Sequence, residues 1–251
     1  QGKIVMITGG SGTIGFAIAE AFSKLGAQTI LVDKDEIALK ESVTKLGVGH
    51  KYFPIDVTHS DAANQAMLAA INNFGGLDIL ISNAGAAHAG PMLDISNEEL
   101  RNAFELNFFS HYSFSTEAAK IMKDQNRGGQ ILFNISKQAV NPGKNFGAYG
   151  LPKATTFFLM RQLALELGSD GIRVNGINAD RIRSGLLTDD FISSRAKSRG
   201  VSESEYMAGN LLNKEVTAEH VADAFTALAC AESTTGHVMT VDGGNIEASL
   251  R

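Results

Sequence analysis

The sequence predicts an α/β fold: a doubly wound parallel sheet of about seven strands with helices on both faces, forming a three-layer α/β/α sandwich. Two patterns predict this class. Short apolar runs alternate along the chain with amphipathic stretches of helix length, which is typical of parallel strands joined by crossover helices. The apolar runs at residues 79–81 and 131–133 show no polar alternation, as expected for strands that are covered on both faces.

We expect strands near residues 3–8, 28–33, 51–55, 77–82, 129–135, 172–177 and 237–241. Helices are expected over residues 13–25, 36–46, 60–74, 97–124, 149–168 and 218–230. Ser96 with Glu99, and Thr217 with His220, have the spacing of N-terminal capping pairs and support two of these helix starts. No linker or internal repeat interrupts the series, so residues 1–251 are interpreted as one domain.

Residues 180–214 depart from this rhythm because they carry many cations among serines and glycines, between a strand and the last helix. An insertion in this place commonly shapes a pocket as a lid. Arg181 and Arg183 are then candidates to hold an anionic or polyhydroxylated substrate, since the planar guanidinium suits carboxylate and phosphate groups. The alternative is a solvated helical hairpin with ordinary surface charges.

Composition excludes several classes of partner. The net charge of -5 disfavours nucleic acid and anionic membranes, which attract basic surfaces. No segment approaches the ~20 apolar residues that span a bilayer, and no signal peptide precedes the first strand, so a cytoplasmic location is expected. Cys230 is the one cysteine, which excludes an internal disulfide, and it is expected to be buried. His88 is expected in a surface loop. The six histidines do not have the spacing of metal ligands, so no catalytic metal is expected.

The turn after the first expected strand has the features of a phosphate-binding loop. Glycines permit a tight turn and a close approach to a pyrophosphate, while the helix that follows offers free N–H groups. The expected cofactor contacts in this turn are Gly9, Ser11, Gly12, Thr13, Ile14 and Gly15. Asp33 ends the second strand, where a carboxylate accepts hydrogen bonds from an adenosine ribose and repels a 2′-phosphate. This combination favours a Rossmann-type site for NAD rather than NADP, although Lys34 weakens the discrimination.

With these residues in place, the chain resembles the short-chain dehydrogenase/reductase family along its whole length. The resemblance rests on the order and spacing of the turn at residues 8–15 and of Asp33, Asp56-Val57, Asn83-Ala84-Gly85, Asn107, Ser136, Tyr149-x-x-x-Lys153 and Val241-Asp242-Gly243-Gly244. The family implies that Asp56 and Val57 contact the adenine and that Asn83, Ala84 and Gly85 line the cofactor cleft.

The same resemblance assigns the catalytic roles. Tyr149 is the acid or base, Ser136 holds the substrate oxygen, and Asn107 completes a proton relay through water to Lys153. Tyrosine has an ordinary pKa of about 10, and a lysine cation at i+4 is expected to lower it by favouring the phenolate. Lys153 is also expected to bind the nicotinamide ribose, and Lys137 is a tentative substrate contact.

Departures from the family pattern keep alternatives open. The spacing of Gly9, Gly12 and Gly15 resembles the epimerase and dehydratase branch, although the rest of the chain resembles the shorter dehydrogenases. Asn178-Ala179-Asp180 replaces the usual Pro-Gly. Pro152 indicates that Tyr149 lies at or near a helix start, since proline suits only the first turn. The alternatives are therefore an NAD-dependent epimerase or dehydratase, and a non-catalytic NAD-sensing domain.

A narrower resemblance concerns the dehydrogenase domains fused to rhamnulose-1-phosphate aldolase in bacterial rhamnose catabolism, a group associated with lactaldehyde. It rests on Asn134-Ile135-Ser136-Lys137, Phe146-Gly147-Ala148-Tyr149, Asn178-x-Asp180 and the basic loop that ends in Leu211-Leu212. The absence of an initiator Met suits an excised domain. The family also implies a homo-oligomer, a dimer or tetramer, formed through the helices expected over 97–124 and 149–168.

Overall fold

The computed structural model describes residues 1–251 except 88, 186 and 246–251, so the expectation for His88 lies outside the described residues. Its centre is a seven-stranded parallel sheet in the order β3-β2-β1-β4-β5-β6-β7. The strands are β1 (Ile4–Thr8), β2 (Gln28–Asp33), β3 (Lys51–Pro54), β4 (Ile79–Ser82), β5 (Gly129–Asn134), β6 (Ile172–Ala179) and β7 (Val238–Val241). The order reverses between β1 and β4, which confirms the doubly wound α/β class.

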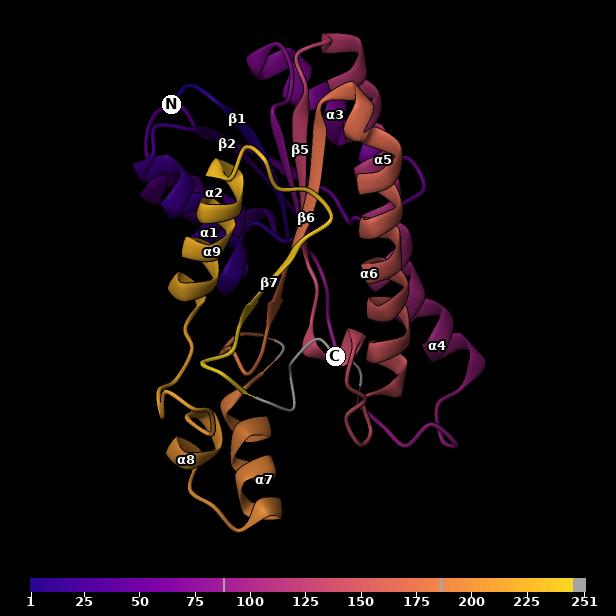
Figure 1. The fold of residues 1–251 in the computed structure, drawn as a ribbon, viewed down its shortest axis with the longest axis vertical. Coiled ribbons are helices and arrows are strands. Elements are labelled where there is room, and N and C mark those ends of the chain that lie inside the picture. Colours follow the sequence, from indigo (N-terminus) through magenta and orange to yellow (C-terminus); the bar gives the residue numbers. More distant parts are fainter. Residues whose placement is uncertain (88, 186, 246–251) are drawn as a thin grey trace.

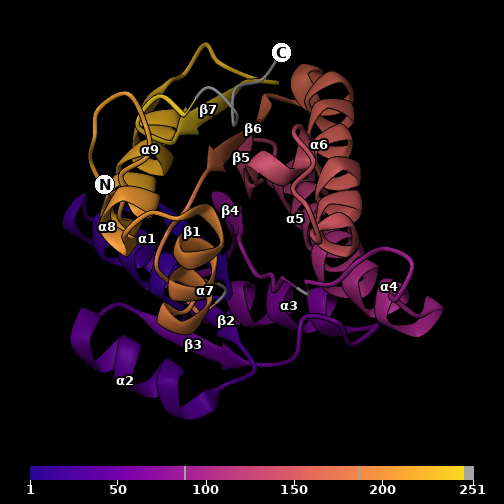
Figure 2. The same cartoon turned by 90° about the horizontal axis from the view of Figure 1, so that it is seen from below.

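Helices cover both faces of the sheet (Figures 1 and 2). One face is covered by α1 (Thr13–Lys24), α2 (Glu36–Leu46) and α9 (Ala218–Cys230), and the other by α3 (Ala62–Phe74), α5 (Ser110–Gln125) and α6 (Gly147–Leu167). Side chains alternate across a strand, so Val5 and Ile7 of β1 pack on the α1 side while Ile4 and Met6 pack on the α5 side. Both sets are buried, which explains the uninterrupted apolar runs in the sequence.

The helix expected over residues 97–124 is interrupted. It consists of α4 (Asn97–Phe104), a π-helical turn (Glu105–Phe109) and α5. The capping pair at its start is confirmed, because the Ser96 hydroxyl accepts the Glu99 N–H and Glu99 accepts the Ser96 N–H. Thr217 likewise donates its N–H to His220 Nδ1 at 3.1 Å before α9.

Tyr149 lies near a helix start as expected, since it is the third residue of α6. Two other sequence expectations about helices are wrong. Because α6 begins at Gly147, Pro152 lies in its second turn and not its first. Cys230 is exposed at the end of α9, since Val221, Phe225 and Leu228 take the buried positions of that helix.

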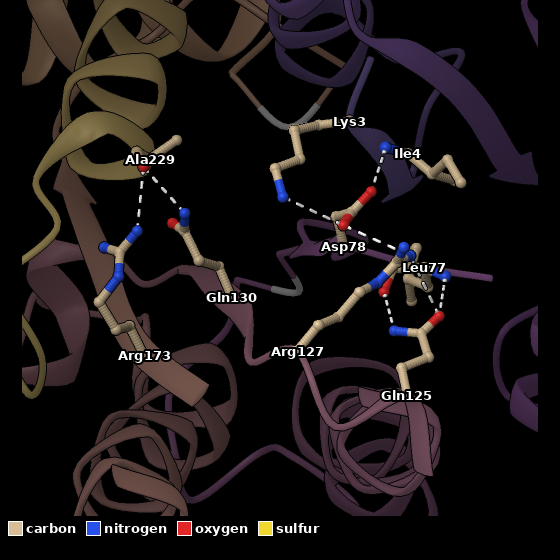
Figure 3. A network of polar contacts seen from close by, with 9 residues as sticks. All are labelled: Lys3, Ile4, Leu77, Asp78, Gln125, Arg127, Gln130, Arg173 and Ala229. Carbon is tan, nitrogen blue, oxygen red and sulfur yellow. Dashed lines mark hydrogen bonds and ion pairs between the residues drawn. The ribbon is translucent and has the colours of Figure 1, made fainter. Parts of the chain in front are cut away.

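Polar contacts fasten the amino ends of the strands (Figure 3). Asp78 accepts the Ile4 N–H at 2.8 Å and the Lys3 ammonium at 3.2 Å, and Arg127 lies 3.5 Å away. Gln125 pairs with both backbone groups of Leu77. On the neighbouring strands, Gln130 and Arg173 donate to the carbonyl oxygen of Ala229. These contacts join neighbouring elements at the amino edge of the sheet.

The segment between β6 and α9 lies beyond the carboxyl ends of the strands (Figures 1 and 2). It contains α7 (Asp189–Arg199) and α8 (Glu203–Met207), which pack on each other through Leu187, Ile192, Ala196, Tyr206 and Met207. Within the described part of the chain, none of the helices has the length and apolarity needed to cross a bilayer.

Candidate active site

A cavity of about 1580 Å³ opens at the carboxyl edge of the sheet. Its wall is formed by the β1–α1 turn, the ends of β2, β4, β5 and β6, the start of α6, and the segment that carries α7. It includes the crevice between β1 and β4, where open α/β sheets bind ligands. Pockets for one drug-sized molecule measure about 300–1,000 Å³, so this cavity has room for a dinucleotide and a smaller second molecule.

The β1–α1 turn has the geometry of a phosphate cradle. Gly9 has a φ of +64°, and a methyl group at Gly15 would overlap the Gly9 carbonyl oxygen, so both positions require glycine. Gly12 is the N-cap residue of α1, and no side chain among the described residues caps this helix, which leaves the N–H groups of the first turn for a ligand. Gly12, Thr13, Ile14 and Gly15 all line the cavity, and this arrangement fits a pyrophosphate.

Asp33 lies beside this turn at the end of β2 and lines the cavity. Its Oδ2 accepts the N–H of Ser11 at 3.2 Å and the hydroxyl of Ser11 at 2.7 Å, and its Oδ1 accepts the Lys34 N–H at 2.8 Å. Ser11, expected as a cofactor contact, therefore holds the Asp33 carboxylate and does not itself line the cavity.

Asp56 and Val57 follow β3 and line the same end of the cavity. The Asp56 carboxylate accepts the N–H of Thr58 at 3.0 Å and its hydroxyl at 2.7 Å. The hydrogen bond from the Thr58 backbone is the largest cause that lowers the pKa of Asp56, so this carboxylate is ionised at neutral pH.

Asn83, Ala84 and Gly85 line the cavity after β4, and Asn83 also joins three strand ends. Its Nδ2 donates to the Thr8 carbonyl at 3.0 Å, and its Oδ1 accepts from Asn134 at 2.8 Å. The Thr8 hydroxyl accepts the N–H groups of Asn83 and Ala84. Asn83 therefore positions the phosphate turn against β5.

Tyr149 and Ser136 meet at the centre of the cavity, from α6 and from the end of β5. Both are buried, and a hydrogen bond joins their side chains. The Ser136 hydroxyl also accepts the Gln138 N–H at 3.2 Å, which orients it. Burial raises the pKa of Tyr149 to about 12, and the bond to Ser136 only partly opposes this effect. For the protein alone, the pKa of Tyr149 is therefore raised and not lowered as expected, because burial is the largest cause.

Lys153 lies one helical turn after Tyr149, with its Nζ 5.8 Å from the centre of the tyrosine ring. The ammonium is buried and donates to the Asn134 carbonyl at 3.0 Å. Burial lowers the pKa of Lys153 to about 7, so its protonation changes near neutral pH. The structure therefore confirms that Lys153 lies close to Tyr149, but the lysine is only partly protonated at neutral pH, which was not expected.

Asn107 occupies the π-helical turn and is buried. Its side-chain carboxamide accepts the Ala86 N–H and donates to the Ala86 carbonyl. Its backbone carbonyl accepts the Thr156 hydroxyl at 2.7 Å. A methyl group at Gly85 would lie 2.9 Å from Asn107 Oδ1 and 3.5 Å from Lys153 Nζ. The two side chains therefore border the same small space beside Gly85. π-helical turns of this kind are frequent at functional sites.

His111 is a neighbour that the sequence analysis did not single out. It is buried behind the site, with Nδ1 2.6 Å from the Ser82 hydroxyl. Burial, with a smaller contribution from the Lys153 charge, lowers the pKa of His111 well below its ordinary value, so the ring is neutral at pH 7. Its position four residues after Asn107, on the same helix face, is the signal that identifies it.

The three tentative substrate residues fare differently. Lys137 and Arg181 line the cavity, but Lys137 pairs with Asp180 at 3.1 Å, and Arg181 donates to the Tyr206 carbonyl at 2.7 Å. Arg183 does not line the cavity, because Asp189 and Glu215 each bind its guanidinium at 2.7 Å. These two ion pairs favour the alternative for Arg183, an ordinary surface charge.

Three lid residues that face the cavity were not selected from the sequence: Arg195, Ser198 and Arg199 of α7. Their i, i+3, i+4 spacing places them on one helix face. That spacing identifies them only once a helix is known at residues 189–199, and the segment was not assigned a helix from the sequence.

Comparison with known proteins agrees with this geometry. A family model described as enoyl-(acyl carrier protein) reductase matches residues 10–245. The "Uncharacterized oxidoreductase YuxG" of Bacillus subtilis (strain 168) is 33% identical over 96% of this chain, and the chain spans 37% of the length of YuxG.

Two solved structures share the fold over almost the full length of both chains. A 3-ketoacyl-(acyl-carrier-protein) reductase from Brucella melitensis, complexed with NADH, is 25% identical with a TM-score of 0.86, covering 97% of this chain and 98% of its own. L-Sorbose reductase from Gluconobacter frateurii, complexed with NADPH and L-sorbose, is 29% identical with a TM-score of 0.88, covering 97% and 96%.

The fold, the phosphate cradle and these matches define the class, an oxidoreductase built on a dinucleotide-binding sheet. The chain belongs to the short-chain dehydrogenase/reductase family, whose members use a nicotinamide cofactor.

Proposed function

We propose that this chain catalyses the NAD(H)-dependent interconversion of an alcohol and a carbonyl in a small polar substrate, such as lactaldehyde or another sugar-derived hydroxy-aldehyde. The observation that carries the proposal is the convergence of Tyr149, Ser136 and Lys153 on one cavity that also contains the phosphate cradle.

In the direction of carbonyl reduction, Tyr149 donates the proton from its phenol oxygen. Its pKa of about 12 keeps the phenol protonated at neutral pH, and the Ser136 hydroxyl holds the substrate oxygen against it. A bound nicotinamide dinucleotide gives or takes the hydride, and its oxidised form adds a positive charge. In the direction of alcohol oxidation, protonated Lys153 favours the phenolate that accepts the proton. Asn107 Oδ1 and Lys153 Nζ, which border the space beside Gly85, are suited to continue the proton path through water.

NAD rather than NADP is the proposed cofactor because of Asp33. Its carboxylate is fixed beside the phosphate cradle by Ser11 and Lys34, where it accepts hydrogen bonds from a ribose diol. The same negative charge opposes a 2′-phosphate. Lys34 also lines the cavity, so its cation reduces but does not remove the discrimination.

An NADH absorbance assay over small alcohols, aldehydes and sugars tests this function against its rivals. The proposal predicts net formation or consumption of NADH with at least one hydroxy-aldehyde or its alcohol. An epimerase or dehydratase, suggested by the spacing of Gly9, Gly12 and Gly15, turns over substrate without net NADH. A non-catalytic sensor binds NADH and turns over nothing. Either of these two results would refute the proposal.

The proposal extends to assembly and domain context. Residues 1–251 form one domain, which assembles as a dimer or tetramer through α5 and α6. Large apolar side chains exposed on these helices support this: Tyr112, Leu151, Phe158 and Leu165, together with Phe109 just before α5. A natural fusion to an aldolase domain, as in the group associated with lactaldehyde, is compatible with the greater length of YuxG.

A further inference from the structure

The outer part of the cavity, under the lid, is basic although the chain as a whole is acidic. Five cations line it: Lys137, Lys144, Arg181, Arg195 and Arg199. Asp180 is the nearby acid that neutralises two of them, since it lies 3.1 Å from Lys137 and 3.5 Å from Arg181. The other three cations have no acidic partner within ion-pair distance among the described residues.

Arg195 is positioned by aromatic rings rather than by an acidic side chain. Its guanidinium carbon lies 5.5 Å from the ring centre of Phe146 and 5.8 Å from that of Phe191, and these two rings pack edge to face. The Nε of Arg195 is buried and has no hydrogen-bond partner in the described part of the protein. The Nε is enclosed by protein atoms, so the terminal amino groups of Arg195 are the donors left for a ligand in the cavity.

Arg199 adds a second guanidinium on the next turn of α7. Its guanidinium carbon lies 5.3 Å from the ring centre of Tyr206, and Ser198 beside it also lines the cavity. Each guanidinium thus lies near an aromatic ring, and its terminal amino groups remain available as donors. The Ser198 hydroxyl donates to the Arg195 carbonyl at 2.8 Å. Two such guanidinium groups suit the oxygens of a carboxylate or phosphate.

The position of these arginines indicates that the anion belongs to the substrate. Arg195 packs on Phe146, which immediately precedes the first residue of α6, the helix that carries Tyr149. The pyrophosphate of a dinucleotide has its own cradle at the start of α1, on the other face of the sheet from α6. The arginines therefore face the side of the cavity where Tyr149 and Ser136 hold the reacting oxygen.

We propose that Arg195 and Arg199 bind a carboxylate or phosphate of the substrate, so that among small hydroxy-carbonyl compounds an anionic one binds more tightly than a neutral one. This inference rests on the proposed function, since it names the substrate class of the same site.

The test titrates the enzyme–NADH complex with glycerol, glycerate and glycerol 3-phosphate at constant ionic strength, with binding followed by calorimetry. The three probes share a polyol chain and differ in their anionic group. At least one anion is expected to bind about tenfold or more tightly than glycerol, and Arg195→Gln or Arg199→Gln is expected to remove most of this preference. The control is Lys197→Gln, which is expected to leave the preference unchanged. Lys197 is exposed on the same helix and does not line the cavity.

Any of three results would overturn the inference. The first is that the anions bind no more tightly than glycerol, and the second is that both arginine variants retain the preference for the anions. The third is that the arginine variants lower the affinity for NADH rather than for the probes, which would assign the arginines to the cofactor pyrophosphate. If the protein binds no NADH, the proposed function fails instead, and the same titrations on the protein alone decide the arginine sites. Thermal unfolding of each variant checks its fold, and Arg195→Lys, which keeps the charge but loses the fork, replaces Arg195→Gln if that variant does not fold.

Discussion

At the scale of single residues, Asp33 is the proposed determinant of cofactor choice. Asp33→Ser removes the carboxylate that binds the ribose and opposes a 2′-phosphate, so NADH affinity is expected to fall about tenfold while NADPH affinity rises. Fluorescence titration with both cofactors measures the change. The control is Asp35→Asn at an exposed position two residues on, where the side chain caps α2 through the Ala38 N–H. Equal loss of both cofactors in Asp33→Ser would contradict this role.

Lys153 predicts a pH dependence of stability. Its pKa is about 7 in the folded protein, against an ordinary 10.5, so the unfolded chain binds more protons between these values. Stability therefore rises with pH across this window, and the charged lysine destabilises the fold most below pH 7. Tyr149, with its pKa raised to about 12, does not titrate in the folded protein over the same range.

Urea unfolding of wild type and Lys153→Met at pH 7 and pH 9 measures this effect. The variant is expected to be the more stable protein at pH 7, and its advantage should shrink by about 2–3 kcal/mol at pH 9. If the difference in unfolding free energy between the two proteins stays constant with pH, burial does not lower the pKa of Lys153.

The site residues differ in how far the sequence alone predicts them. Gly9, Gly15 and Asp33 were predictable, because a tight turn and a strand end constrain which residue types fit there. The pKa of Tyr149 was not, since spacing shows the nearby lysine but not the burial that outweighs its charge. The ion pair of Arg183 could not be predicted either, because its acidic partner Glu215 is distant in sequence and meets it only in the folded chain.

At the scale of elements, the polar contacts at the amino edge of the sheet are structural and the carboxyl edge is functional. Asp78→Ala removes the acceptor of the Ile4 N–H, so the free energy of unfolding is expected to fall by about 1–3 kcal/mol. NADH affinity should stay unchanged, since Asp78 precedes the first residue of β4, whereas the cavity is lined by Asn83 after its last residue.

Asp170→Ala is the matched control for this prediction. Asp170 pairs with Lys123 at 2.9 Å, but both side chains are partly exposed, so its loss is expected to cost less than about 1 kcal/mol. Denaturant unfolding compares the two variants. Equal losses would mean that the amino-edge contacts do not stabilise the sheet.

Hydrophobic periodicity in the sequence predicts the strands and most helices, because buried parallel strands and amphipathic helices require such patterns. The π-helical turn at Glu105–Phe109 did not, since one widened turn leaves the apolar pattern of a long helix almost unchanged. The lid helices were missed for a related reason. α7 contains many charged and polar residues and buries only Ile192 and Ala196, so its periodicity is weak.

At the scale of the whole molecule, the proposed assembly predicts that α6 is an interface. Phe158 is 68% exposed and Leu165 is 79% exposed on this helix. Phe158→Asp with Leu165→Asp is expected to convert the oligomer to a monomer, because association would bury two unpaired charges. Analytical ultracentrifugation measures the change, and Ile37→Asp, 74% exposed on α2, is the control. A monomeric wild type, or an oligomer that survives the double substitution, would refute this interface.

The central claim is that Tyr149 transfers the proton while the rest of the chain positions it against the substrate and an NAD cofactor. The most direct test compares wild type with Tyr149→Phe, using the best substrate from the NADH absorbance screen. We expect kcat to fall by about 10²–10⁴-fold and the Kd for NADH to change little, since the substitution removes one hydroxyl and keeps the ring. A Tyr149→Phe enzyme that turns over NADH as fast as wild type would contradict this claim.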